Sequence, residues 1–368
     1  MQNTQSSRPP RHPLLHLRSA RRPSTRWHQV GLLWGLFAPL ALHGCGDDTG
    51  SKPGTADAGI VNAVDSSAVA DVATGIDATS AIDTARTATN FIAMPQGAPE
   101  TTLWDAAHSL LYIIDNTGNA IWKWTDAGGL VPFVSCPLPA GETSLPANVT
   151  LGQAALLADG TLVVARFGQP GGGDGGIAYV RKDGTAGLVP NLDPTIRRLG
   201  LVAGPDGTLY GSTFGGSGNN IIGTVTTVDL QAGETTIADG FGKIVGLVIA
   251  DGRFYVSDQT AGKIFYAPAA ALPPHAAAWT ALATLVKPDQ ICAGPNGSLF
   301  TGQFQGAPGS TDPIAIRQIS ADGVVSIFKQ DPEVSKPSGV SYDPVGRRLF
   351  AADSGNVANI GVRIFSVP

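Results

Sequence analysis

The chain has few cysteines, and its histidines are scattered. Cysteine occurs only three times in 368 residues, at positions 45, 136 and 292. Four of the six histidines lie at or before His43, and the other two are far apart in the sequence. No Cys/His cluster of the kind that holds structural zinc is therefore present, and a zinc-stapled scaffold is excluded.

Helical periodicity is also missing. No stretch after residue 90 keeps a helical hydrophobic period for long, whereas 47 glycines and 27 prolines supply many turns. This pattern indicates an all-β protein. Closed all-β folds routinely exceed about 200 residues as one unit, so one large domain is sufficient.

A short phrase ending in an aromatic-rich strand recurs six times after residue 100. It reads LLYIID at 110–115, LVVAR at 162–166, LYGST at 209–213, FYVSD at 254–258, LFTGQ at 299–303 and LFAAD at 349–353. Between the equivalent residues 112, 163, 210, 255, 300 and 350 the spacings are 51, 47, 45, 45 and 50. This is the period of four-stranded propeller blades, and it predicts a six-bladed β-propeller.

The last repeat is one strand short. In the first blade we expect four strands, at 101–104, 110–115, 120–124 and 130–134. The chain ends at Pro368 after the third strand of the last blade, and the segment Asn90–Pro95 before blade one is predicted to supply the missing outer strand and close the ring. The propeller then spans residues 90–368. Cys136 and Cys292 fall in blades one and five, which are not neighbours, so no disulfide is expected between them.

The first 44 residues have the features of a secretion signal. Six arginines and no acidic residue precede the apolar segment Val30–Leu42, which is too short to span a bilayer comfortably and fits a signal-peptide core. The sequence Leu42–Cys45 resembles the cleavage box of bacterial lipoproteins, in which the cysteine becomes the lipidated N-terminus. We therefore expect residues 1–44 to be removed and Cys45 to anchor the protein to a membrane. The alternative is an ordinary secretory signal with a chance cysteine.

Residues 45–89 consist mostly of Ala, Asp, Ser, Thr and Gly, with no aromatic residue before Phe91. Such a segment cannot offset its ordering entropy, so a disordered tether is predicted. Loss of residues 1–44 leaves 18 of 24 basic and all 29 acidic residues, which moves the net charge from -5 to -11. An acidic surface argues against nucleic-acid binding. We expect a monomer in the bacterial cell envelope, outside the cytoplasm; Gly46 after Cys45 favours the outer membrane.

The first strand of each blade lines the central channel, so functional residues should collect just before each phrase. Alignment of the blades on their turns gives six equivalent positions: Glu100, Gly152, Leu199, Val245, Asp289 and Ser338. The two carboxylates come from blades one and five, and their side chains can converge in the channel. Three further carboxylates, Asp115, Asp258 and Asp353, end equivalent strands, which indicates a structural role in accepting backbone N–H bonds.

Three segments resemble a known family. Pro99–Trp124 is similar to the opening blade of the gluconolactonase, senescence-marker and luciferin-regenerating-enzyme family of six-bladed propellers. Pro288–Gly306 resembles the blade that carries the metal-binding and catalytic Asp of this family, and Ile196–Gly207 resembles the segment near its substrate-contacting Arg. The resemblance runs over all six blades, from Phe91 to the end of the chain.

The resemblance implies roles for three residues. Glu100 matches the first metal-binding carboxylate, Asp289 the metal-binding and catalytic Asp, and Arg197 falls near the substrate-contacting Arg. The family completes its cation site with two Asn oxygens, but Leu199 and Val245 occupy those positions here. Because an oxygen-seeking cation needs about six ligands, Glu100 and Asp289 with waters would make a more hydrated site for Ca²⁺, Mn²⁺, Mg²⁺ or Zn²⁺.

Three functions are compatible with the sequence. A metal-dependent hydrolase would polarise a lactone or ester carbonyl with the ion, use Asp289 as ligand and proton acceptor, and hold the substrate with Arg197. A catalytically degenerate propeller would instead bind a protein or glycan ligand through its loops, with Glu100 and Asp289 as hydrated channel carboxylates. The third function is an assembly scaffold on the cell envelope, for which the long tether is the main support.

Overall fold

A computed structural model describes residues 90–95, 97–138, 142, 150–168, 173–216, 220–303, 312–355 and 360–368. The predicted signal segment, the lipidation site Cys45 and the tether lie outside these residues. Apart from two short 3-10 segments, η1 (Ala276–Ala278) and η2 (Pro295–Gly297), the regular structure of the described residues is β. Within the same residues, no helix is long and apolar enough to cross a membrane.

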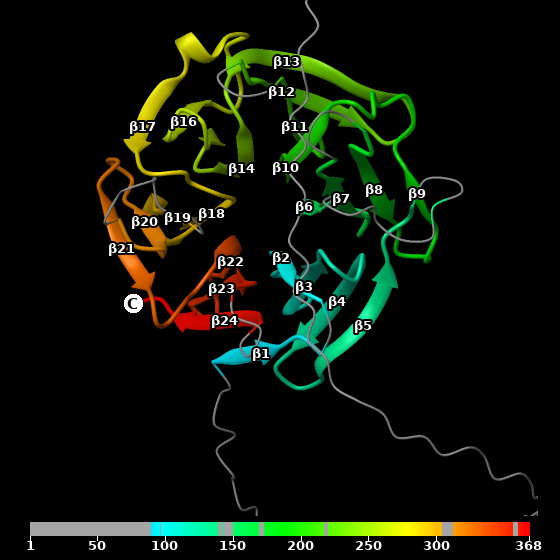
Figure 1. The fold of residues 1–368 in the computed structure, drawn as a ribbon, viewed down its shortest axis with the longest axis vertical. Helices are drawn as coiled ribbons and strands as arrows, with labels where there is room; N and C mark the ends of the chain where they lie inside the picture. The colour runs from blue at the N-terminus through cyan, green and yellow to red at the C-terminus, as the bar shows by residue number, and fades with distance from the viewer. Residues whose placement is uncertain are drawn as a thin grey trace, which may run out of the picture. The chain divides into compact units, whose positions relative to one another are not determined.

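The strands form six four-stranded antiparallel sheets, arranged as the blades of a ring (Figure 1). Blades one to three comprise β2 (Pro99–Asp105), β3 (Leu110–Asp115), β4 (Ala120–Thr125) and β5 (Gly129–Ser135); β6 (Leu151–Leu156), β7 (Leu162–Arg166), β8 (Gly176–Val180) and β9 (Ala186–Leu188); and β10 (Arg197–Ala203), β11 (Leu209–Gly215), β12 (Ile222–Asp229) and β13 (Gly233–Phe241). Blades four to six comprise β14 (Ile244–Ala250), β15 (Arg253–Asp258), β16 (Lys263–Pro268) and β17 (Thr280–Thr284); β18 (Ile291–Ala293), β19 (Leu299–Gln303), β20 (Ala315–Ile319) and β21 (Val325–Gln330); and β22 (Pro337–Asp343), β23 (Arg348–Asp353), β24 (Gly361–Ser366) and β1 (Phe91–Ala93). The six-bladed prediction is therefore confirmed.

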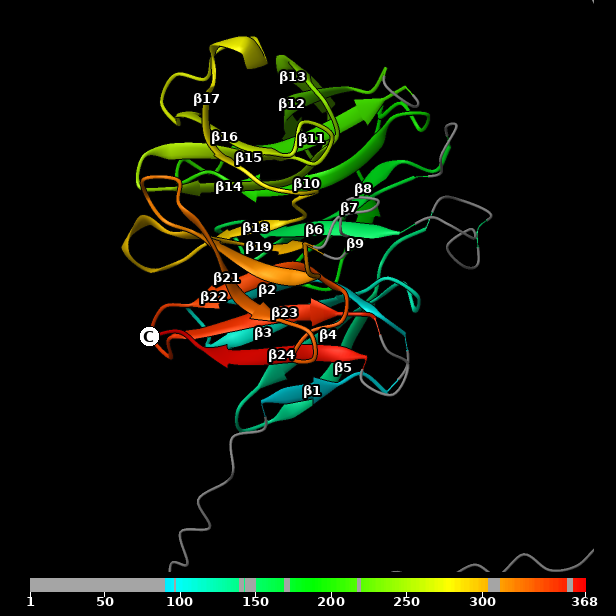
Figure 2. The same ribbon diagram turned by 60° about the vertical axis from the view of Figure 1, so that its left-hand side comes forward.

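The N-terminal strand closes the ring as predicted. β1 pairs antiparallel with β24, with Ile92 opposite Val362, and the two strands lie side by side in Figures 1 and 2. Ile92 and Met94 are buried in one apolar cluster with Trp124 of blade one and Phe350 of blade six. The first and last segments of the propeller are thus joined by backbone pairing and by a shared core.

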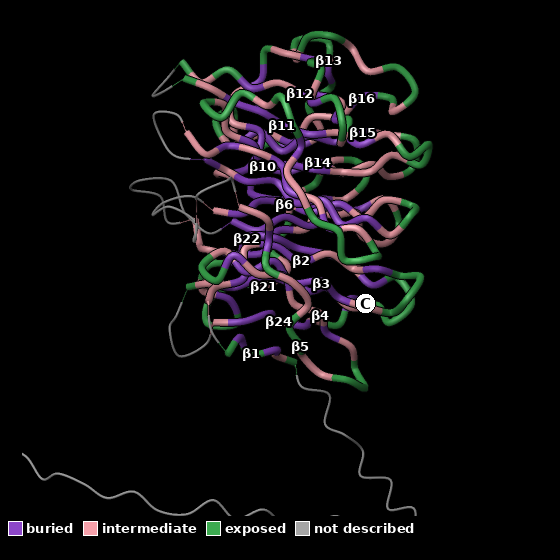
Figure 3. Tube along the Cα trace, turned by 90° about the vertical axis from the view of Figure 1, so that its right-hand side faces the viewer, coloured by how far each residue is buried: buried purple, intermediate pink, exposed green. Residues whose placement is uncertain are grey.

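The core lies between neighbouring blades. The second strand of five blades is almost completely buried, because both of its faces pack against other blades (Figure 3). Tyr112 and Ile114 of blade one, for example, pack against Leu162 and Val164 of blade two. This two-sided burial explains why the repeated phrase reads as a continuous apolar run without the alternation of a half-exposed strand.

The aspartates at the strand ends hold turns. The Asp115 carboxylate accepts hydrogen bonds from the backbone N–H groups of Ala98 (3.0 Å) and Gly118 (3.0 Å). The Asp258 and Asp353 carboxylates do the same, accepting from Gly242 N (2.7 Å) and Lys336 N (2.7 Å), respectively. The predicted structural role of these three residues is confirmed.

The two cysteines of the propeller are free thiols, as the blade assignment predicts. Cys136 is buried beside blade two, and burial raises the pKa of its thiol to about 12. Cys292, in β18, is half-buried. Neither thiol is therefore a reactive group at neutral pH.

Candidate active site at the channel mouth

The six positions that the turns align lie at or just before the first residues of the inner strands of their blades. The innermost strand of each blade contacts the innermost strands on either side, which forms a ring of β2, β6, β10, β14, β18 and β22. Five of these strands carry a bulge near their first residues. The bulges contain Glu100, Gly152, Leu199, Val245 and Ser338. A bulge re-aims side chains, and Glu100, Leu199 and Ser338 of these bulges line one cavity.

The two predicted carboxylates converge. Glu100 from β2 and Asp289, which precedes β18, line one cavity of about 200 Å³ at the mouth of the channel. The other lining residues are Asn116, Thr150, Phe167, Leu199, Lys243, Gln259, Lys336, Ser338 and Ser354. The backbone carbonyl of Glu100 accepts a hydrogen bond from Ser338 Oγ (2.5 Å), and Asp289 N donates to Gly302 O (2.9 Å). Both carboxylates are thus mounted on fixed backbone.

Burial and mutual repulsion control the charge of this pair. Burial raises the pKa of Glu100, and the neighbouring Asp289 carboxylate raises it further, while the ammonium groups of Lys336 and Lys243 oppose the shift. Burial likewise raises the pKa of Asp289, against the opposing effects of Lys243 and the Gln290 backbone N–H. The pair therefore holds its protons more tightly than free carboxylates do at neutral pH.

Three basic residues lie two positions before the aligned residues of their blades. The sequence-based prediction included only one of them, Arg197. In blades one, two, four and six, the residue before the inner strand accepts a backbone N–H bond from the residue just after the second strand. The acceptors are Ala98, Thr150, Lys243 and Lys336, and Arg197, paired with Phe214, takes the corresponding place in blade three. Three of these equivalent positions are basic. The same alignment, moved two residues toward the N-terminus, would have found Lys243 and Lys336.

Arg197 does not line the cavity itself. Its guanidinium carbon lies 3.8 Å from the ring centroid of Phe167, which does line it, and 5.0 Å from that of Phe214. Its Nε is buried without a hydrogen-bond partner in the described part of the chain. Lys243 Nζ lies 5.3 Å from the Phe167 centroid. Both cations therefore lie against the Phe167 ring, through which Arg197 is connected to the cavity.

The donor set does not fit the divalent cation that the resemblance implies. Leu199 and Val245, at the positions of the expected Asn ligands, are buried in an apolar cluster with Phe214. Among the described residues, no group of three or more His, Cys, Asp or Glu side chains is placed to hold a metal ion. The cavity therefore offers an ion two carboxylates and the neutral oxygens of Asn, Thr, Gln and Ser side chains, beside two lysine ammonium groups that repel it.

Two glutamines bridge the channel beyond this mouth. Gln153 Oε1 accepts hydrogen bonds from Leu201 N (3.1 Å) and Leu247 N (3.0 Å), and its Nε2 donates to Ile291 O (3.3 Å). One side chain of blade two thereby ties the inner strands of blades three, four and five. Gln290 Nε2 donates to the Glu100 carbonyl (3.5 Å) and connects blade five to blade one. Sequence reasoning did not identify either residue.

A larger cavity of about 940 Å³ lies at the turns that follow the inner strands of blades one to four. Its lining is mainly Ala, Gly, Leu and Pro of these turns, together with scattered charges such as His108, whose Nδ1 is 2.7 Å from Asp105 Oδ2. Size alone does not make a site, because chemistry needs converging polar groups. The smaller cavity has them, and we assign function there.

Known structures share this fold. No protein-family model matches the chain, and no curated protein matches it in sequence. A gluconolactonase of Xanthomonas campestris superimposes with a TM-score of 0.55 at 17% identity, covering 76% of this chain and 88% of its own. For a luciferin-regenerating enzyme the values are 0.55, 16%, 73% and 90%. For a calcium-binding regucalcin of Agrobacterium tumefaciens they are 0.53, 15%, 74% and 90%. The predicted resemblance is thus confirmed at the level of the fold.

Proposed function

We propose that this protein is an envelope-anchored, lactonase-like propeller that hydrolyses a lactone or ester at the channel mouth. The convergence of Glu100 and Asp289 in one cavity supports this proposal most directly, since paired carboxylates are suited to acid–base chemistry. The fold that this chain shares with a gluconolactonase supports the choice of this reaction class. Asp289 is the proposed proton acceptor, and Arg197 contacts the substrate above Phe167.

The proposed reaction is the addition of water to the carbonyl carbon. Burial raises the pKa of Asp289 to about 6, which is close to the ideal value for a general base at neutral pH. Asp289 takes a proton from the attacking water as the C–O bond forms, and returns it to the leaving oxygen as the ester bond breaks. Glu100, whose pKa is raised further, is suited to hold a proton near the same carbonyl.

A hydrolysis assay with a panel of lactones and aryl esters tests the proposal. Asp289→Asn should lower kcat/KM by about 10²- to 10⁴-fold, the range expected on loss of a general base. Asp206→Asn, which changes an aspartate in the turn between β10 and β11, is the matched control and should leave the rate unchanged. If the wild-type protein hydrolyses nothing in the panel above the buffer rate, the hydrolase proposal is wrong and the binding-module alternative replaces it.

We also propose anchoring through lipid on Cys45, which keeps the propeller outside the cytoplasm. The position of Cys45 directly after an apolar segment supports this. Cys45→Ser should release the protein from the membrane fraction into the soluble envelope or the medium. A Cys45→Ser protein that stays in the membrane pellet after a high-salt wash would contradict the anchor.

A further inference from the structure

This site differs most clearly from a metal site at Leu199 and Val245, where the ion would need side-chain oxygens. Leu199 is 5% exposed and Val245 is fully buried, and both pack against Phe214. These side chains cannot offer oxygen to an ion. They also cannot swing out of the way, because they belong to the packed core between blades three and four. The charge that would compensate Glu100 and Asp289 must come from elsewhere.

Lys243 is positioned to supply that charge. It immediately precedes β14 and lines the same cavity as both carboxylates. Its Nζ donates a 2.7 Å hydrogen bond to Gln259 Oε1. The Nε2 of Gln259 in turn donates to the carbonyl of Pro288 (3.4 Å), the residue before Asp289. The Gln259 amide therefore connects the ammonium to the backbone that carries the catalytic carboxylate, which fixes the lysine at the site.

We propose that the Lys243 ammonium takes the place of a divalent cation in this channel, so that the site works without a metal. A lysine ammonium is a compact point charge with three N–H donors. One donor is held by Gln259, which leaves two for a ligand oxygen, while Asp289 and Glu100 act on the ammonium through their charge. A metal ion in the same cavity would be repelled by Lys243 and by Lys336, and apart from Glu100 and Asp289 the lining offers it only neutral oxygens.

The chemical step rests on the proposed hydrolase function. Lys243 donates a hydrogen bond to the carbonyl oxygen of the substrate as negative charge develops there, which is the role that an oxyanion-stabilising group plays. The water oxygen forms the new C–O bond, and its proton passes to Asp289. The ester C–O bond then breaks, and the proton moves from Asp289 to the leaving oxygen. Lys243 keeps its own protons throughout, and the reaction needs no cofactor.

The decisive experiment compares the response of thermal stability to metal in three proteins. Wild type, Lys243→Met and the control Lys263→Met are each melted in EDTA and in about 5 mM CaCl₂ or MnCl₂. This concentration is about a hundredfold above the Kd of a site with a Kd of about 50 µM. Lys263 begins β16 of the same blade, away from the cavity. The wild type and Lys263→Met should shift by less than about 1 °C. Lys243→Met should gain about 2–4 °C or more with metal, because the carboxylates then lack their built-in cation.

The outcomes separate this inference from the proposed function. A metal-dependent rise in the wild-type Tm overturns the inference whether or not any substrate is turned over. A Lys243→Met protein that folds but gains nothing from metal also overturns it, because Lys243 would then not be what compensates the pair. If Lys243→Met does not fold, Lys243→Gln replaces it under the same criteria. When a substrate is found, wild-type activity should be unchanged by EDTA, and Lys243→Met should lose about 10²- to 10³-fold in kcat.

Discussion

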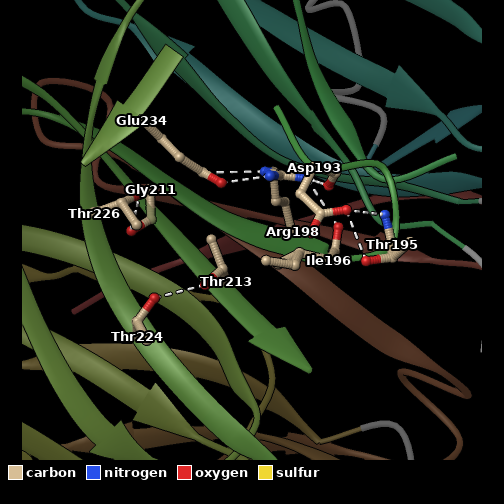
Figure 4. Close-up of polar contacts among 9 residues, drawn as sticks. All are labelled: Asp193, Thr195, Ile196, Arg198, Gly211, Thr213, Thr224, Thr226 and Glu234. Atoms are coloured by element: carbon tan, nitrogen blue, oxygen red, sulfur yellow. Dashed lines mark hydrogen bonds and ion pairs between the residues drawn. The ribbon is translucent and has the colours of Figure 1, made fainter. Parts of the chain in front are cut away.

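Two adjacent arginines in β10 are used in opposite ways. Arg198 is 1% exposed and its guanidinium is saturated: Nε and Nη2 pair with Glu234 of β13, and Nη1 donates to the carbonyls of Asp193 and Ile196 (Figure 4). Arg197 points instead toward the channel mouth and stacks on Phe167, with its buried Nε unpartnered within the described chain. Of these two arginines, Arg198 is satisfied within its blade, whereas Arg197 keeps capacity for a ligand.

The carboxylates show the same division. Asp353 accepts hydrogen bonds from Lys336 N (2.7 Å) and Ser335 N (3.1 Å), and so it fixes the segment that enters β22. Glu100 lies at the mouth, where burial and the Asp289 charge raise its pKa. A group bound by backbone donors is a structural part, while a group whose protonation is perturbed by neighbouring charges is a candidate for chemistry. The predictions below test this division.

The largest expected effect comes from breaking the framework at its closure. A chain that starts at Gln96 loses β1, with the buried side chains of Ile92 and Met94, and exposes the edge of β24. Each such side chain contributes about 2–5 kcal/mol, so the free energy of unfolding should fall by at least about 4 kcal/mol. Urea melts measure this. A chain starting at residue 86 is the control, and equal stability of the two chains would show that β1 does not close the ring.

The second comparison exchanges each arginine of β10 for methionine. Arg198→Met leaves the half-buried Glu234 without its partner and removes the bonds to two carbonyls, so we expect a loss of about 3 kcal/mol in unfolding free energy. Arg197→Met should cost less than about 1 kcal/mol, because it removes no hydrogen bond within the described residues. It should instead raise the KM or Kd for the ligand. Similar stability losses for the two variants would contradict the division between framework and mouth.

The smallest expected effect is a pH dependence that belongs to the mouth. Glu100 has a pKa of about 8 in the folded protein against an ordinary value of 4.5, so the folded state binds a proton that the unfolded chain releases. Its stabilisation is complete below pH 4.5 and is lost as pH rises to about 8. Relative to Glu100→Gln at each pH, the wild-type Tm should therefore fall steadily across this window.

Because Asp289, Lys243 and Lys336 face the same cavity, only the difference between the two proteins is informative. Asp353→Asn, at a framework carboxylate, serves as the matched control and should be destabilised at every pH in the window. A wild-type Tm that tracks that of Glu100→Gln across the whole range would show that Glu100 titrates as an ordinary surface carboxylate.

Much of the fold was predictable because its causes are local and repeated. The spacing of the apolar phrases and the turn residues specify six blades, and the missing last strand identifies Asn90–Pro95 as the closure. The pair Glu100 and Asp289 was predictable for the same reason, since equivalent positions in a ring face one channel. Lys243 was not, because its role depends on what lies across the channel. Gln153 was missed because its four hydrogen bonds go to three residues in three other blades.

The hydrogen bonds of Gln153 across the channel affect how a ligand can enter and leave the propeller. Its side chain spans the bore of the propeller, and Gln290 binds the Glu100 backbone beside it. We expect this bridge to block the passage of a ligand from one face of the ring to the other along the axis. A ligand that enters beside Asp289 must then leave through the same opening. Product and incoming substrate therefore compete for that opening, and accumulated product should slow turnover.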